Sequence, residues 1–192
     1  LCEQGRNFCN KIWNCFRLIK GWEVADNEMP ATNQWGVEWF KAVLAKTQEE
    51  VADLFSKYRL SEALMAIYKL YCDEFSGWYL EIIKPAYGQP IDRATYEQTI
   101  QFMDTMLKLL HPFMPFITEE LWQAIEERQE GESLMVSPLN AEQTLDKAAQ
   151  LLENATQCFD IISAIRNIRA QKNISPKEVL TLVAPSELPA VV

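Results

Sequence analysis

The chain has 192 residues, of which 48% are hydrophobic and 23% charged, and its net charge is −9. These values predict one large globular domain, or one domain with a small appendage. No stretch approaches 18 consecutive uncharged apolar residues, so the sequence predicts no membrane span. The only histidine is His111, which excludes zinc sites built on two histidines and di-iron bundles with paired Glu-x-x-His motifs.

The cysteines and the first residues bear on where the protein works. Five cysteines form an odd set, and no two of them have the CxxC spacing. This argues against a disulfide framework and favours a reducing cytosol, so we expect a cytoplasmic protein. The chain begins without an initiator methionine or a signal-peptide pattern, and we interpret it as a part of a longer chain.

The positive charges are concentrated in two strips. Each strip holds four cations against a single acid: Arg6, Lys11, Arg17 and Lys20 against Glu3, and Arg166, Arg169, Lys172 and Lys177 against Asp160. The rest of the chain therefore carries −15. Such a distribution is compatible with RNA that docks in one orientation, and ordinary solvated helix faces are the alternative.

The hydrophobic spacing predicts helix after helix. A helix over residues 3–20 places one apolar stripe on a single face and ends at Gly21; the stripe consists of Phe8, Ile12, Cys15, Ile19 and Trp22. A second helix is expected over residues 34–58, with Asn33 as its N-cap. A third is expected over residues 61–84, where Pro85 ends it, and its inward stripe includes Leu64, Ile67, Leu70, Tyr71, Phe75 and Trp78.

The second half of the chain continues the pattern. We expect helices over residues 93–110, from Pro115 onward, and over residues 141–172. The last of these carries an inward stripe of Leu145, Ala148, Leu152, Ala155, Phe159, Ile162 and Ile165. Residues 178–184 (EVLTLVA) are short and β-branched, which predicts a strand at the start of a C-terminal appendage.

No pattern predicts catalysis. The sequence lacks a Gly-rich phosphate loop, a GxSxG elbow and a Cys–His pair, and adjacent acids on a helix point about 100° apart. His111 precedes Pro112, so we expect it to buttress a helix end. Large aromatic residues at helical spacing are expected in the core; these are Trp13, Trp78, Trp122 and Phe116. We predict neither catalytic residues nor metal ligands.

The first helix has an unusual polar face. Steps of about 100° per residue place Arg6, Asn7, Asn10, Asn14 and Arg17 in one arc opposite the apolar stripe, with Lys11 just beyond it. Asparagine offers donors and acceptors to base edges, and arginine offers a fork for phosphate or guanine. This composition indicates recognition of a polar, anionic surface, and a solvated face with interhelical hydrogen bonds is the alternative.

Four segments together resemble a known domain. They are RNFCNKIWN at residues 6–14 with Arg17 after it, GWYLEIIKP at 77–85, LLHPFMPFITEELW at 109–122 and IRNIRAQKNISP at 165–176. In order and spacing they resemble the anticodon-binding domain of class I aminoacyl-tRNA synthetases, and the valyl branch more than the isoleucyl or leucyl ones. They are spread over most of the chain, from residue 6 to residue 176.

The resemblance implies an all-α bundle that grips the anticodon stem-loop of valine tRNA, where phosphate contacts set the register and side chains read unstacked bases. It implies a helical domain over residues 1–172 and, over 173–192, the start of an appendage that leads to a coiled-coil arm. The parent enzyme would ligate valine to tRNA with ATP. The family's HIGH and KMSKS motifs are absent here, so we expect no activity and no cofactor in this chain.

The implied contact residues lie mainly on the first helix. Arg6 and Arg17 would contact backbone or base edges, Asn10 and Asn14 would read polar groups with Lys11 beside them, and Leu18 would pack on a base, as would Leu80 of the middle helix. Leu18 departs from the aromatic residue that some members have there, which puts base stacking in doubt. Arg166 and Arg169 would contact tRNA or brace the arm.

Two alternatives remain at this point. One is the same domain from an isoleucyl or leucyl enzyme, which binding to stem-loops with different anticodons would distinguish. The other is a helical scaffold that binds protein helices in an apolar groove. The acidic bulk of the chain supports the scaffold, which predicts no response to RNA at low salt.

Overall fold

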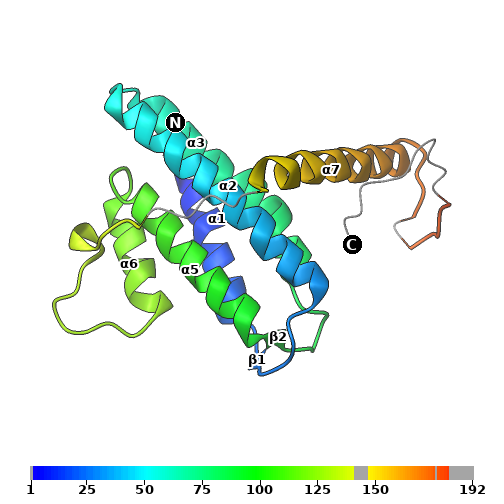
Figure 1. Cartoon of the computed structure of the whole chain (residues 1–192), viewed down its shortest axis with the longest axis horizontal. Helices are drawn as coiled ribbons and strands as arrows, with labels where there is room; N and C mark the ends of the chain where they lie inside the picture. The colour runs from blue at the N-terminus through cyan, green and yellow to red at the C-terminus, as the bar shows by residue number, and fades with distance from the viewer. Residues whose placement is uncertain (1, 141–146, 176, 182–192) are drawn as a thin grey trace. The chain divides into compact units, whose positions relative to one another are not determined.

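The computed structural model describes residues 2–140, 147–175 and 177–181, most of them helical (Figure 1). The elements in chain order are α1 (Cys2–Lys20), β1 (Val24–Ala25), α2 (Ala31–Ser56), α3 (Leu60–Lys69), the π-helix η1 (Leu70–Tyr79), α4 (Leu80–Ile83), β2 (Ile91–Asp92), α5 (Arg93–Leu110), α6 (Pro115–Ile125), the 3-10 helix η2 (Leu134–Val136) and α7 (Ala148–Gln171). The predicted all-α bundle is confirmed. No helix among the described residues is long and apolar enough to cross a membrane.

The chain divides into two compact units, Leu1–Thr144 and Leu145–Val192. The first unit contains every element from α1 to η2, and the second contains α7. Compactness alone does not test where a domain ends, so the domain boundary expected at residue 172 stays a prediction.

The core of the first unit is an aromatic cluster between α2, η1 and α5. The Phe40 ring lies 4.8 Å from that of Tyr79, 5.0 Å from that of Phe102 and 5.3 Å from that of Phe75, measured between ring centroids. All four side chains are buried, and the Tyr79 hydroxyl is 2.8 Å from the Thr99 hydroxyl. Burial raises the pKa of Tyr79, so its hydroxyl stays protonated and hydrogen-bonded.

The third predicted helix forms, but its middle is a π-helix. Buried side chains recur every four residues along α3, η1 and α4, at Ile67, Tyr71, Phe75, Tyr79 and Ile83. In an α-helix each step of four would turn the stripe by about 40°, because a turn takes 3.6 residues. The wider π turns keep the stripe on one face.

The π-helix corrects one core prediction. An α-helical wheel turns Trp78 inward, whereas Tyr79 occupies the interior position and Trp78 is only half-buried. Two other aromatic predictions were wrong: Trp13 is 40% exposed at the rim of the α1 stripe, and Phe116 is 90% exposed in the first turn of α6. Trp122 is buried as predicted, and its indole N–H donates to Asp104 at 2.7 Å.

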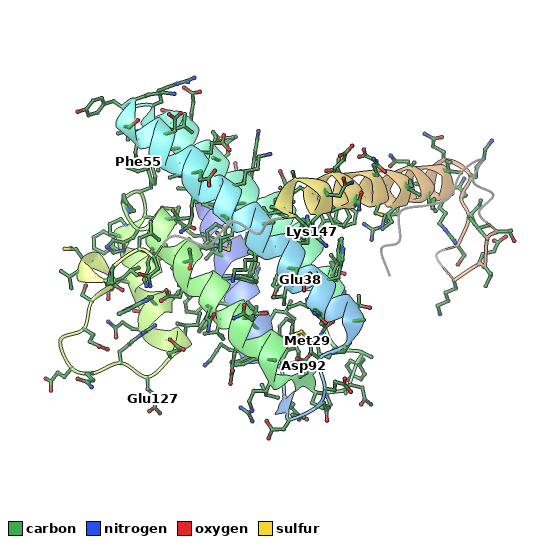
Figure 2. All side chains as sticks on the ribbon, in the orientation of Figure 1. Met29, Glu38, Phe55, Asp92, Glu127 and Lys147 are labelled. Atoms are coloured by element: carbon green, nitrogen blue, oxygen red, sulfur yellow. The ribbon has the colours of Figure 1, made fainter. Side chains whose placement is uncertain are left out.

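Asp92 joins three elements at one end of the first unit (Figure 2). One carboxylate oxygen caps α5 by accepting from the Thr95 amide at 2.8 Å, and the other accepts from the Asn33 amide group at 3.0 Å. β1 and β2 pair in parallel beside it, with Val24 opposite Ile91. The prediction that Asn33 caps α2 was wrong: Pro30 holds the N-cap position, and buried Asn33 lies inside the helix.

The turn between α5 and α6 is held by His111, as predicted. Its Nδ1 lies 2.8 Å from the Thr118 hydroxyl, across the two prolines that separate the helices. Glu119 fixes the following loop, because its carboxylate accepts from the Leu134 amide and the Ser133 hydroxyl. Partial burial alone would raise the pKa of Glu119, but these hydrogen bonds and one from Gln123 outweigh it and lower the pKa.

The second unit contains α7, which begins at Ala148; residues 141–146 of the predicted helix lie outside the described residues. Of its predicted inward stripe, Ala155 is buried and Ile162 is exposed, which corrects that position. Leu145 lies outside the described residues, and the remaining stripe positions are half-buried. The predicted strand is absent over residues 178–181, and residues 182–184 lie outside the described part of the chain.

Asp92→Ala is expected to lower the free energy of unfolding by about 2–4 kcal/mol. The change removes a helix cap, worth about 0.5–2 kcal/mol, and leaves the buried Asn33 amide without its acceptor, which costs about 1–3 kcal/mol. Urea unfolding followed by circular dichroism measures the loss. Asp26→Ala is the control, because its ion pair with Arg93 is exposed to solvent and adds little stability. Equal losses in both variants would contradict this role for Asp92.

Candidate nucleic-acid interface

The amphipathic α1 is the element that the sequence singled out, and its apolar stripe faces the core as predicted. Phe8, Ile12, Cys15 and Ile19 are buried, with Ile12 fully inaccessible to solvent. The Phe8 ring packs on Tyr68 of α3 and Tyr71 of η1, at centroid distances of 4.9 and 5.8 Å. This packing fixes the rotation of α1 about its own axis, which in turn determines which residues face solvent.

The opposite face of α1 is exposed and largely uncommitted. Asn7, Asn10, Asn14 and Arg17 are all exposed, and within the described part of the chain their side chains make no hydrogen bond or ion pair. Leu18 is 44% exposed beside them. Donors, acceptors and one guanidinium are therefore displayed together on one helix face, ready for a polar ligand.

The other cations of α1 have partners within the protein. Arg6 lies 3.7 Å from the Glu3 carboxylate, and both side chains are well exposed, so this pair adds little stability. The Lys11 ammonium donates to the Cys72 carbonyl oxygen at 3.2 Å, and the Lys20 ammonium donates to the Ile125 carbonyl oxygen at 3.1 Å. The basic strip seen in the sequence is therefore mostly engaged, and Arg17 is its unengaged member.

A pocket of about 450 Å³ opens beside this face, between α1 and the segment formed by η1 and α4. Its α1 wall consists of Asn7, Asn10, Lys11, Asn14, Cys15 and Leu18, and its second wall consists of Ser76, Leu80 and Glu81. Leu80 is only 2% exposed, so it forms part of the pocket wall without projecting into solvent. Aliphatic surface and hydrogen-bonding groups together suit a flat, polar-edged group such as a nucleobase.

The thiols at this pocket are uncharged. Burial raises the pKa of the Cys15 thiol, against the lowering effects of the Ser76 hydrogen bond and the Lys11 charge. Burial likewise raises the pKa of the Cys72 thiol in η1. Both thiols therefore stay protonated near neutral pH, and the charges next to the pocket are those of Lys11 and Glu81.

The two arginines predicted on the last helix lie in the second unit. Arg169 donates to the carbonyl oxygens of Ser175 and Glu178, at 2.7 and 2.8 Å, so its guanidinium holds the chain that follows α7. Arg166 is exposed one turn earlier and also has an interaction partner. Of the nine predicted contact residues, the structure brings five together around the pocket. They are Asn10, Lys11, Asn14 and Leu18 of α1 and Leu80 of α4.

The sequence analysis missed Ser76 and Glu81 as pocket residues. Both lie on the second wall, where the π turns shift every side chain relative to an α-helical wheel. The four-residue spacing of the buried stripe in this segment also fits an α-helix, so it did not reveal the shift.

Comparison with known proteins places the chain. A family model described as the anticodon-binding domain of tRNA ligase matches residues 37–184, well over half of the chain. The chain belongs to this family. The matched residues begin within α2, so α1 precedes them.

Curated relatives of this anticodon-binding domain are similar over nearly the whole chain. A valine–tRNA ligase of Phocaeicola vulgatus is 64% identical over 95% of the chain, and one of Parabacteroides distasonis is 59% identical over 95%. A valine–tRNA ligase of Bacteroides thetaiotaomicron is 59% identical over 98% of the chain, which includes most of α1. The chain spans about a fifth of the length of these relatives (21%, 21% and 22%).

Replacing both Asn10 and Asn14 by alanine is expected to leave the anticodon-binding domain as stable or more stable. Their side chains have no partners among the described residues, and alanine exceeds asparagine in helix propensity by up to about 0.7 kcal/mol per residue. Thermal unfolding followed by circular dichroism measures the change. Ile12→Ala is the contrasting variant, with an expected loss of about 2–5 kcal/mol. A clear destabilisation by the double asparagine variant would show that the fold itself requires these side chains.

Proposed function

We propose that this chain is the part of a valine–tRNA ligase that binds the anticodon stem-loop of valine tRNA. The observation that carries the proposal is the uncommitted face of α1, where Asn10, Asn14 and Arg17 stand exposed beside the pocket. Membership of the anticodon-binding family supports RNA as the ligand, and the names of the relatives support valine tRNA.

In this proposal the exposed face of α1 forms hydrogen bonds with the RNA, and the pocket packs against a base. Arg17 forms charge-assisted hydrogen bonds to a phosphate or to a base edge, and Asn10 and Asn14 donate to and accept from base edges. An unstacked base enters the pocket, where Leu18 and Leu80 pack against its faces. Single-stranded loops suit this arrangement because their bases are free to leave the stack.

The reaction of the parent enzyme would lie outside this chain. We propose that the complete protein ligates valine to tRNA with ATP, as the names of the relatives indicate for valine and tRNA. HIGH and KMSKS are absent here, so ATP would be bound by a catalytic domain elsewhere in the parent chain, which would also carry a coiled-coil arm. The described cysteines, Cys9, Cys15, Cys72 and Cys158, are all free, which supports a cytoplasmic location.

In this proposal, Arg169 of the second unit binds the protein's own backbone and does not contact RNA. Its two bonds to backbone carbonyl oxygens support a role in directing the segment after α7, and Arg166 has the more exposed position for a contact with tRNA. Exposed cations of this kind would contact the phosphate backbone without reading sequence.

A binding titration tests the proposal. Two anticodon stem-loops that differ only in the anticodon, one of valine and one of isoleucine, are titrated at low salt and followed by heteronuclear NMR. We expect shifts of the α1 and η1 amides, tighter binding of the valine stem-loop and a steep loss of affinity with salt. Preference for the isoleucine anticodon would assign the other branch, and no response to either RNA at low salt would favour the protein-binding scaffold.

Arg17→Ala is expected to weaken stem-loop binding by about 1–3 kcal/mol, because Arg17 is the uncommitted cation on the proposed face. Filter binding measures the change, and circular dichroism confirms the fold. Arg59→Ala is the matched control. It removes an exposed arginine that lies between α2 and α3 and pairs with Glu62 of α3. An affinity unchanged by Arg17→Ala, or lowered equally by both variants, would remove Arg17 from the site.

A further inference from the structure

We propose that Lys11 and Lys20 are positioning residues, which clamp α1 on its two flanks and so set the width and orientation of the pocket beside it. Their effect on RNA affinity rests on the proposed function, whereas the clamp itself is a property of the fold. The proposal assigns Lys11 a different role from the direct RNA contact expected from the sequence.

The Lys11 clamp joins α1 to the π-helix. Its side chain is half-buried, and its ammonium donates to the Cys72 carbonyl oxygen at 3.2 Å. Gly77 approaches the same carbonyl closely: a Cβ added there would lie 3.3 Å from the Cys72 oxygen. One backbone oxygen thus links α1 to the π-helix that also carries Ser76 of the pocket wall.

The Lys20 clamp joins α1 to α6. Its ammonium donates at 3.1 Å to the carbonyl oxygen of Ile125, the last residue of that helix. The last carbonyl oxygens of a helix have no N–H partner within it, and they carry the partial negative charge of its C-terminal end. An ammonium group there is therefore favourable. This bond spans 105 positions in sequence and ties the C-terminal end of α1 to a helix from the far half of the unit.

The two lysines restrain rotation of α1 about its axis in opposite directions. Nine residues separate Lys11 from Lys20, which at about 100° per residue puts them on opposite sides of the α1 axis. Ile12 and Ile19 face the core between them. Rolling α1 in either direction therefore requires one clamp to break. Such a roll would move Asn10 and Asn14 relative to Leu80, and this relative position defines the pocket.

The labelling rate of two buried thiols measures the Lys11 clamp in the absence of RNA. Cys15 of α1 and Cys72 of η1 are buried where these segments meet, so they react with a maleimide faster when the segments separate. In a chain whose other cysteines (Cys2, Cys9 and Cys158) are serine, Lys11→Met is expected to raise the labelling rate about tenfold, the effect of losing one hydrogen bond from a charged donor. Lys11→Arg keeps a donor and is expected to restore most of the protection.

RNA binding separates positioning from contact. For both Lys11→Met and Lys20→Met we expect valine stem-loop affinity to fall about tenfold, with an unchanged slope of log affinity against log salt. A lysine that contacts a phosphate would instead reduce the magnitude of that slope by about 0.7–1 when removed. Lys46→Met is the matched control: it removes an exposed lysine of α2 and is expected to change neither the labelling rate nor the affinity.

The outcomes are distinct. Faster labelling and weaker binding at constant salt slope support the clamps. A reduced slope with unchanged labelling would show that Lys11 contacts RNA, and no change in either measurement would show that the bond is dispensable; both results overturn the proposal. If the unmodified chain binds no stem-loop, the proposed function fails, and the labelling rates still decide whether Lys11 clamps α1.

Discussion

The burial of the α1 stripe in the first unit is the interaction on which the rest of the candidate interface depends. Phe8, Ile12, Cys15 and Ile19 leave solvent together, and each large apolar side chain contributes about 1.5–3 kcal/mol when buried. Because an α-helix is rigid, hiding this stripe forces Asn10 and Asn14 outward. The polar face is therefore a geometric consequence of core packing, and its chemistry can vary without loss of the fold.

The π-helix is the second constraint, because it lets one continuous helical segment serve two surfaces. Its wide turns keep Tyr71, Phe75 and Tyr79 in the core, while Ser76 and the start of α4 face α1. At Gly36 the backbone of α2 comes so close to α4 that an added Cβ would lie 2.9 Å from Ile82. With α4 held from that side, the wall that carries Leu80 has little freedom to retreat from the pocket.

Local signals in the sequence were sufficient for most helices and for the orientation of α1. The predicted bounds of α5 match the structure, because Asp92 caps its start and Pro112 follows its end. The polar arc of α1 was predictable because a regular helix converts spacing directly into direction. The N-cap prediction failed because a distant partner decides: Asn33 bonds to Asp92, 59 positions away. The bond of Lys11 to Cys72, 61 positions away, was likewise not foreseen. No local pattern encodes such pairs, and the fourfold spacing that marks η1 is easily taken for an α-helix.

The hydrogen bonds of Lys11 and Lys20 within the protein reduce the number of α1 cations that remain available to an anionic ligand. The chain carries −9 overall, and of the α1 cations Lys11 and Lys20 already serve backbone carbonyls. Few cations remain to neutralise phosphates, so binding through this face would draw less on counterion release than the basic strip suggests. Specific affinity must then come from base packing and from hydrogen bonds that are correctly placed before RNA arrives. In the proposed complex, rigid placement of α1 would therefore matter more than a high density of positive charge.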